Sequence, residues 1–522
     1  MKRYSAYMDE ITPDELYKGL LKEGMFTEKL PPIFTSEPFY EYSKSCSKGA
    51  RQKWSGKWDW IPYTSIRNNG LPRLLGIPSP FAYERLCQCL ASNWPELQKI
   101  FQENTINDPY KVSQTHIRKI TGTEMLFEMN YKNWQLDSSP ENELRIGARY
   151  VVETDISTCF PSIYTHALPW AVYGKKEAKE MMVNKTLKNS WPDKLDKACR
   201  DTTNGETHGV LIGPHASNVL FELLLTKIDA ELREEKKNWK FVRYIDDYHC
   251  YVQTYSEGKI FLSRLDRILR NYDLQLNYKK TKIMELPQYE KSFWTKTIGL
   301  YKELLLKRTY LDYKTVENYL SHIIHCFNEN PEDAAIINYG LKVLVNTIHR
   351  NGVRVSMNAR NYIISTMEYL SCIYIYLIPL MENFLFEFFS VGVSQIQNFA
   401  NQIYATEAGV GSAEAKTYAF YYALKYGFSL SPTITFNKII ESNDCVLKLM
   451  AYLYFKRENI CSYAEQLLDQ VRAMDKSDRE KNWVYAYEVL DESELTDNRW
   501  KELKRRKISF LYDEFQIKTG KR

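Results

Sequence analysis

The ten cysteines of this 522-residue chain form no Cys-x-x-Cys pair and no spacing typical of a zinc site. Several lie in apolar runs, as reduced, buried thiols of a cytosolic protein do. Long apolar runs are also lacking. The most apolar stretch, Tyr369–Met381, is short and contains Pro379, so a buried helix explains it better than a membrane span. Residues 1–7 lack the apolar segment of a signal peptide. We therefore expect a cytoplasmic protein that does not contact a membrane.

The chain also lacks a strong charge of one sign. Its formal net charge is +5, and the excess of Lys and Arg lies in residues 1–300, whereas residues 301–522 are neutral. A surplus this small is weak support for nucleic-acid binding. Its local clustering is more informative, because Lys279, Lys280 and Lys282 follow a strand-like run.

The length predicts two or three domains with substantial hydrophobic cores. Beyond residue 300, apolar residues recur at three- and four-residue spacing, which is typical of packed helices. Short breaks at Asn330-Pro331, Asn351-Gly352 and Ser431-Pro432 separate the segments. The pattern predicts an irregular helical solenoid without a clean sequence repeat. The helical segments are expected near 313–328, 332–350, 358–378, 382–403, 412–426, 443–456, 461–473 and 479–490.

Two adjacent carboxylates, Asp246 and Asp247, stand in the run Phe241–Val252 with strand-forming residues on both sides. This pattern predicts a β-hairpin that presents the two acids at its tip. Like charges this close repel each other unless a cation neutralises them, and Mg²⁺ prefers such oxygen ligands. Taken alone, the pair would be read as an acidic surface turn.

A third carboxylate, Asp155, ends the apolar strand-like run Tyr150–Asp155. If this strand lies beside the hairpin, three carboxylates meet on adjacent strands. Two-metal phosphoryl transfer requires such a ligand set, because one ion activates the attacking hydroxyl and both stabilise the charge that develops on phosphorus.

Two further segments have features of a nucleotide site. The run His208–Glu222 is a loop broken by Gly213 and Pro214 that leads into a helix, where the backbone can approach a nucleotide closely. The run Leu274–Lys282 is predicted as a strand that ends in a basic cluster able to meet a triphosphate.

In this order, the Asp155 strand, the Gly-Pro loop, the Tyr244-Ile245-Asp246-Asp247 hairpin and the Asn277–Thr281 segment resemble palm motifs A to D of reverse transcriptases. Residues 67–79 resemble the fingers segment, and Ile298–Leu300 falls where the short strand after the palm would lie. The resemblance covers about residues 60–300.

The resemblance implies an α+β fold: right-hand polymerase fingers and palm (residues 1–300, with an N-terminal extension over 1–60), then an all-α HEAT-like helical repeat domain (301–522). It implies a DNA polymerase using Mg²⁺, or Mn²⁺, held by Asp155, Asp246 and Asp247. Arg73 and Lys280 would meet the triphosphate of a dNTP, beside Gly213 and Pro214. Phe160 would lie under the ribose and exclude a 2′-hydroxyl.

Cys159–His166 and the Gly209, Gly213-Pro214, Ser217 pattern are similar to those of bacterial abortive-infection and "unknown group" reverse transcriptases, which include AbiK and its prophage-encoded relatives. This similarity implies a role in antiphage defence, a homo-oligomer (trimer or hexamer), and untemplated synthesis primed by the protein. The single-stranded DNA product would then stay covalently attached. Tyr40 and Tyr42 are candidate primers, because their polar Ser- and Lys-rich run is expected to be an exposed loop.

Two alternatives stay open at this point. The chain could be a template-directed, retron-like reverse transcriptase that acts on a cognate RNA; His208, where many reverse transcriptases have Gln, leaves the handling of a template undecided. It could also be a non-catalytic nucleic-acid-binding scaffold. The intact carboxylates argue against a scaffold, because a binding module has no use for three negative charges beside a phosphate backbone.

Overall fold

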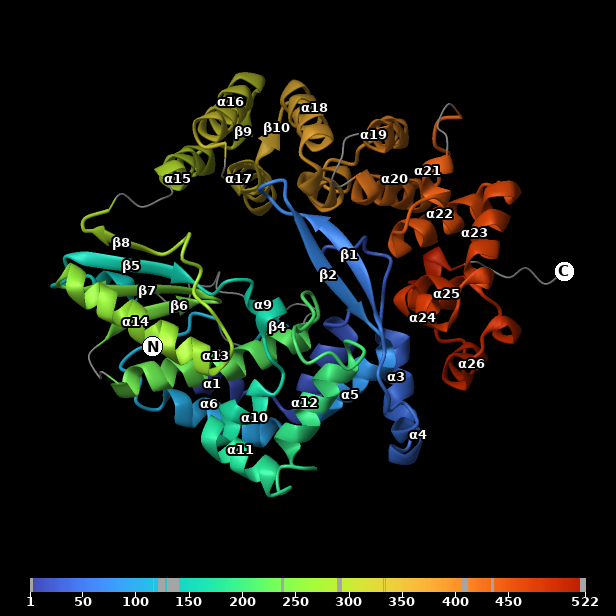
Figure 1. Ribbon diagram of the computed structural model, residues 1–522. Helices are drawn as coiled ribbons and strands as arrows, with labels where there is room; N and C mark the ends of the chain where they lie inside the picture. Colours follow the sequence, from blue (N-terminus) through green and yellow to red (C-terminus); the bar gives the residue numbers. More distant parts are fainter. Residues whose placement is uncertain are drawn as a thin grey trace.

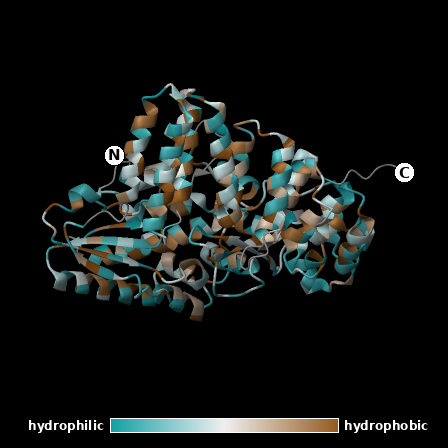
Figure 2. Ribbon diagram, turned by 90° about the horizontal axis from the view of Figure 1, so that it is seen from above, coloured by the Kyte–Doolittle hydropathy of each residue, from teal (hydrophilic) through white to brown (hydrophobic). Residues whose placement is uncertain are grey.

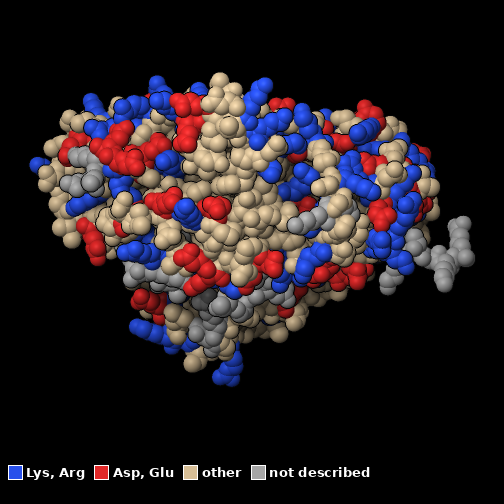
Figure 3. Space-filling model, turned by 90° about the horizontal axis from the view of Figure 1, so that it is seen from below, with Lys and Arg blue, Asp and Glu red and all other residues tan. Residues whose placement is uncertain are grey.

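We describe a computed structural model of the chain over residues 3–115, 117–120, 127–128, 140–235, 239–288, 293–331, 333, 335–405, 412–432 and 436–516 (Figure 1). No helix in these segments is long and apolar enough to cross a membrane. On the face drawn in Figure 3, acidic and basic side chains are intermingled around a broad uncharged area, in keeping with the small net charge.

A four-stranded antiparallel sheet forms the centre of the N-terminal half, with strand order β6-β7-β5-β8. Its strands are β5 (Tyr150–Asp155), β6 (Lys240–Tyr244), β7 (Asp247–Val252) and β8 (Lys282–Glu285). β-branched and aromatic residues, among them Val152, Phe241 and Tyr248, favour strands and are buried here. The helices α13 (His215–Glu235) and α14 (Tyr255–Asn271) cover one face of the sheet. The predicted hairpin, the Asp155 strand and the helix after the Gly-Pro loop are thus confirmed.

The N-terminal half contains further helices. They are α8 (Glu141–Leu144), α9 (Cys159–Ser162), α10 (Ala167–Tyr173), α11 (Lys175–Val183) and α12 (Trp191–Asp201). The N-terminal helices α1 (Tyr4–Met8), α2 (Pro13–Lys18), α3 (Glu37–Ser45) and α4 (Lys48–Gln52) precede α5 (Pro80–Ser92) and α6 (Trp94–Thr105). A π-helix, Gly19–Glu23, continues α2, and β3 (Arg118–Lys119) pairs with β4 (Phe127–Glu128).

The predicted fingers segment is a long β-hairpin of β1 (Trp60–Ile66) and β2 (Pro72–Pro78), which lies between the two halves of the molecule (Figure 1). Gly70, with a φ of +74°, makes its turn possible, because other residues rarely adopt this conformation. At the base of the turn, the buried Glu414 accepts hydrogen bonds from Ser65 Oγ at 2.9 Å and from the Ile66 N–H at 2.8 Å. A residue of the C-terminal half therefore holds the hairpin in place.

The C-terminal half forms an arc of helices, as the periodicity predicts (Figure 1). Its α-helices are α15 (Phe293–Leu306), α16 (Tyr313–Glu329), α17 (Ala335–Asn351), α18 (Met357–Ile373), α19 (Val393–Ala405), α20 (Ser412–Tyr426), α21 (Asn437–Ile440), α22 (Cys445–Arg457), α23 (Cys461–Ala473), α24 (Lys476–Lys481), α25 (Trp483–Val489) and α26 (Asn498–Arg505). Shorter elements are the parallel pair β9 (Tyr310–Leu311) and β10 (Arg354–Val355), the 3₁₀ turns at 375–380, 492–494 and 513–515, and a π-helix at 382–386. In Figure 2 these helices carry both hydrophobic (brown) and hydrophilic (teal) residues, as expected of amphipathic helices.

The end of the chain packs against its beginning. Phe34 forms an isolated β-bridge with Leu511, and the ring of Phe26 lies 6.4 Å from that of Trp483. Trp500 packs edge-on against Phe81, with ring centroids 4.7 Å apart. A single buried apolar cluster consequently runs through both halves. The expected boundary at residue 300 lies inside α15, so the helical region begins earlier, near residue 293.

Two local predictions are wrong. Ile298–Leu300 is not a strand but the middle of α15, because its apolar residues continue a helical pattern and Ile298 is buried. The basic cluster does not follow a strand; it lies in the turn before β8, which begins at Lys282.

Candidate active site

The three acidic residues predicted to form the site come together at one end of the sheet. Asp155 is the last residue of β5 and lies directly opposite Asp247, the first residue of β7. Asp246 occupies the turn between β6 and β7, after Ile245, whose φ of +58° is unusual for a β-branched residue. The tight turn therefore places Asp246 and Asp247 beside the end of β5.

The carboxylates repel each other in the absence of a cation. Burial, together with the nearby charges of Asp247 and Asp155, raises the pKa of Asp246 to about 6. Asp155 is 4% exposed; its Oδ2 accepts a hydrogen bond from Lys280 Nζ at 2.6 Å. Its Oδ1 is buried and has no hydrogen-bond partner within the described residues. A buried, unpaired carboxylate oxygen is costly unless a cation or a donor satisfies it.

The donor set fits a hard divalent cation. Within the described segments, no three acidic, His or Cys side chains enclose a metal position by themselves. Mg²⁺ does not require such a cage, because it commonly binds through one or two carboxylates and completes its shell with water and substrate phosphates. Asp155, with its unpaired Oδ1, and Asp246 would hold the ions, with Asp247 in support.

This electrostatic balance gives a prediction about metal and pH. The raised pKa means that folded Asp246 holds its proton more tightly than the unfolded chain does, so its contribution to stability is present at low pH and is lost as pH rises through about 6. We therefore expect Mg²⁺ to raise the melting temperature more at pH 8 than at pH 5. Thermal melts at both pH values, with and without Mg²⁺, measure this, and an equal Mg²⁺ effect would contradict it.

Lys280 and Arg73, the two cations predicted to meet a triphosphate, interact electrostatically with the carboxylates. Lys280, whose side chain is 67% exposed, lies in the turn before β8, and its hydrogen bond to Asp155 raises its pKa. Arg73 lies on β2, within electrostatic reach of Asp246, although desolvation and the charge of Arg67 together lower the pKa of Arg73. The fingers hairpin and the palm thus each direct a cation toward the acidic cluster.

The residues predicted to contact the ribose and the nucleotide, Phe160 and Gly213, both pack against other parts of the protein. The partly exposed ring of Phe160 stacks on Phe221, with ring centroids 5.0 Å apart and planes inclined by 7°. Gly213 has a φ of +123°, and a Cβ there would lie 3.3 Å from the side chain of Thr27. In this structure the Gly-Pro loop therefore packs against protein, and its contact with a nucleotide stays a prediction.

The structure does not support the reasoning that selected Tyr40 and Tyr42 as primers. Their segment is the helix α3, not a loop, and Figure 1 places α3 far from the β5–β8 sheet. Tyr40 is buried, with its ring 5.9 Å from that of Tyr17, and Tyr42 packs against Trp54. Pro38 in the first turn begins the helix, and the aromatic residues then pack inward despite the polar composition of the run.

Arg243 is a supporting residue that the sequence does not single out. It is fully buried; its Nε donates to Asp229 Oδ2 at 2.8 Å, and its Nη1 donates to Glu222 Oε2 at 3.1 Å. Nη1 also donates to the carbonyl oxygen of Ile245 at 2.9 Å, directly before Asp246. Because both carboxylates belong to α13, Arg243 connects the helix after the Gly-Pro loop to the turn that contains Asp246.

We expect Arg243→Ala to lower the free energy of unfolding by about 3–5 kcal/mol, because it leaves two buried carboxylates without a counter-charge. Urea denaturation of the purified variant measures this loss. Arg264→Ala is a matched control, because Arg264 is half-exposed in its ion pair with Glu235 and should contribute no more than about 1 kcal/mol. Equal losses in the two variants would show that the buried network has no special role.

Residues 82–324 match the protein family described as "Reverse transcriptase (RNA-dependent DNA polymerase)". The matched segment contains the three carboxylates, Phe160, the Gly-Pro loop and Lys280. The chain therefore carries a reverse-transcriptase domain and is an enzyme of the RNA-directed DNA polymerase class. The predicted fold class, a polymerase fingers and palm followed by an all-helical region, is confirmed. Arg73 lies on the hairpin just before the matched segment.

Comparison with solved structures gives low similarity scores. Telomerase from Candida albicans in complex with a fragment of telomeric RNA has 11% sequence identity and a TM-score of 0.29, covering 78% of this chain and 67% of that one. Apo telomerase from Candida tropicalis has 13% identity and a TM-score of 0.31, covering 74% and 72% of the two chains. No curated protein matches the chain.

Proposed function

We propose that the protein is a Mg²⁺-dependent DNA polymerase that adds dNTPs at the acidic cluster of β5 and the β6–β7 turn. One observation carries this proposal: Asp155 and Asp247 lie opposite each other on paired strands, with Asp246 beside them and a buried Asp155 oxygen unpaired. When bound, the ions would activate the attacking hydroxyl and neutralise charge on the phosphoryl group. Lys280 and Arg73 would bind and orient the triphosphate from two sides, and Mn²⁺ would serve as a substitute ion.

Phe160 is proposed to select the sugar. Its ring is fixed against Phe221 and partly exposed, so it can occupy the space next to a ribose C2′. We expect Phe160→Ala to raise the ratio of rNTP to dNTP incorporation by about tenfold or more, since a steric clash of 1–3 kcal/mol corresponds to this range. Phe160→Tyr is the matched control, because it keeps the ring. An unchanged ratio in Phe160→Ala would make Phe160 a packing residue.

The similarity of Cys159–His166 to abortive-infection enzymes supports a finer proposal. We infer an antiphage defence enzyme, related to AbiK and acting in the cytoplasm as a homo-oligomer. Its synthesis would need no template and would start from a protein hydroxyl, so that single-stranded DNA stays attached to the chain. Tyr40 and Tyr42 are unsuited to this role as they are packed here, so the primer hydroxyl would belong to another residue.

A second candidate is template-directed synthesis on a cognate RNA. The description of the matched family, an RNA-dependent polymerase, favours it. The two candidates share the same metal site and differ in the primer and in the requirement for RNA.

One experiment separates them. Purified protein is incubated with labelled dNTPs and Mg²⁺, with and without added RNA, and the product is treated with nuclease or protease after boiling in detergent. Label that forms without RNA and stays on the protein until nuclease treatment supports protein-primed, untemplated synthesis. Protein-free DNA that forms only with RNA supports the templated candidate. Absence of any incorporation under all conditions contradicts the proposed polymerase.

A further inference from the structure

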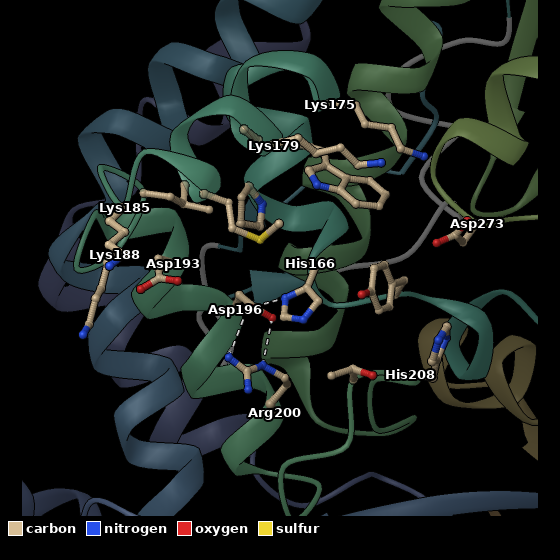
Figure 4. A pocket seen from close by; sticks show the side chains of 17 residues that line it. His166, Lys175, Lys179, Lys185, Lys188, Asp193, Asp196, Arg200, His208 and Asp273 are labelled. Atoms are coloured by element: carbon tan, nitrogen blue, oxygen red, sulfur yellow. Dashed lines mark hydrogen bonds and ion pairs between the residues drawn. The ribbon is translucent and has the colours of Figure 1, made fainter.

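A cavity lies between α10, α11 and α12, and none of the carboxylates Asp155, Asp246 and Asp247 lines it (Figure 4). Its volume is about 730 Å³, which is within the range of pockets that enclose small-molecule ligands. Cationic and aromatic side chains dominate its wall, a combination suited to a ligand that carries both phosphate and a planar ring.

The charge of the cavity is positive. Its lining contains five cationic side chains and three carboxylates. Two of these carboxylates already form hydrogen bonds with other groups of the protein. Asp196 is buried, lies 2.8 Å from His166 Nδ1 and accepts from Arg200 Nε at 3.2 Å. Asp193 accepts from the Asn189 N–H at 3.0 Å. Among the carboxylates of the described segments, none forms an ion pair with Lys179, Lys185 or Lys188, so these lysines remain available to an anion.

Aromatic rings form the rest of the site. The Nζ atoms of Lys175 and Lys179 lie 4.3 Å and 5.7 Å from the centre of the Trp170 ring. This cation–π arrangement holds both ammonium groups beside the Trp170 ring, which lines the cavity. On another side, the rings of Tyr164 and His208 stack with centroids 4.8 Å apart. Figure 4 shows Lys179 directed over the cavity, with His166 and Asp196 opposite it.

The cavity wall is continuous with the loops of the active site. Tyr164 and His208 form an isolated β-bridge. The Gly209 N–H donates to the carbonyl oxygen of Ile163 at 2.9 Å, and the Val210 N–H donates to that of Phe160 at 3.0 Å. One of these two segments contains Phe160 between Asp155 and Tyr164 in the sequence. The other leads from His208 into the Gly-Pro loop. The cavity wall and Phe160 are therefore linked through backbone hydrogen bonds.

We propose that this cavity is a second nucleotide site, which binds a nucleotide phosphate together with its base without a divalent metal. The phosphate would lie beside Lys175 and Lys179, and the base would stack in the aromatic part of the wall. Two sources share this chemistry: a free nucleotide, and a nucleotide within single-stranded nucleic acid. The proposal does not depend on the proposed polymerisation, because lysine-bound phosphate requires neither Mg²⁺ nor catalysis.

The test measures binding in excess EDTA, which removes metal-dependent binding at the carboxylates. The probes are fluorescein-labelled oligothymidylate, followed by anisotropy, and radiolabelled dATP, followed by equilibrium dialysis. We expect the double substitution Lys175→Gln with Lys179→Gln to weaken binding of the responding probe about tenfold. If that probe is the oligonucleotide, we also expect a weaker dependence of binding on salt. The slope of the logarithm of the binding constant against the logarithm of the salt concentration should fall in magnitude by about 0.7 for each lysine removed. Lys176→Gln is the matched control, because Lys176 is exposed on the same helix and does not line the cavity.

The outcomes separate the two sources. Loss of dATP binding in the double variant assigns the site to a free nucleotide, and loss of oligothymidylate binding alone assigns it to a strand. The proposal is overturned if the wild-type protein binds neither probe in EDTA, if the double variant binds both as tightly as the wild type, or if Lys176→Gln weakens binding equally. Circular dichroism and thermal melts establish that each variant is folded as the wild type is.

Discussion

Asp246→Asn should reduce the rate of nucleotide incorporation by several orders of magnitude while the protein stays folded. The substitution removes a proposed metal ligand and, with it, stabilisation of the charge that would develop in the transition state. Asn keeps the size of the side chain, so packing at the β6–β7 turn is preserved. Incorporation of labelled dNTP, measured under single-turnover conditions with saturating Mg²⁺, gives the size of the loss.

The control for this variant is its stability. Asn removes the charge of Asp246, which the charges of Asp247 and Asp155 repel, so the metal-free variant should melt at or above the temperature of the wild type at pH 8. A large drop in melting temperature would mean that the lost activity reports unfolding. Near-wild-type activity would contradict the assignment of Asp246 as a ligand.

Removal of the helical region should have the second large effect. A fragment that ends at Leu306 loses the partners of buried aromatic residues in the N-terminal half, because Trp58 and Phe81 pack on Trp500 and Phe39 packs on Phe510. It also loses Glu414, which holds the fingers hairpin. Exposed apolar surface of this extent promotes aggregation. We expect an insoluble, inactive fragment, assessed by sedimentation after expression.

A point variant tests the same interface without truncation. Trp500→Ala should lower the free energy of unfolding by about 3–5 kcal/mol, because the buried aromatic side chain leaves a cavity in a tightly packed cluster. A matched control is Tyr512→Ala, since Tyr512 is 47% exposed. A soluble and active fragment of residues 1–306 would show that the two halves fold independently and would overturn the account of the shared core.

The three carboxylates could be predicted because each depends on a local pattern. Alternating strand-forming residues flank Asp246-Asp247, and an apolar strand ends at Asp155, so sequence periodicity alone placed them at strand ends. The C-terminal helices were predictable for the same reason. The eight apolar-periodic segments fall on helices in the structure, although 358–378, 382–403 and 479–490 each extend over two helical elements.

What could not be predicted depends on residues far apart in the chain. Arg243 binds Glu222, whose carboxylate also accepts from Tyr4, 218 positions away. The packing of Phe34 against Leu511 likewise has no local signal. At Tyr40, polar composition predicted a loop, but tertiary burial of Phe39, Tyr40 and Ser43 on one face favours the helix. The three- and four-residue spacing of Phe39, Tyr40 and Ser43 is typical of one face of a helix, and it could have been recognised in the sequence.

The central claim is that divalent ions at Asp155 and Asp246 contact the phosphate under attack. Incorporation of the two diastereomers of dATPαS, compared with dATP in Mg²⁺ and in Mn²⁺, tests this contact directly. Sulfur in place of a metal-bound oxygen binds hard Mg²⁺ poorly and softer Mn²⁺ better. We predict that one diastereomer reacts far more slowly than dATP in Mg²⁺ and recovers in Mn²⁺, in the wild-type protein. Equal rates for both diastereomers and dATP with either metal, or incorporation that persists in EDTA, would contradict the account.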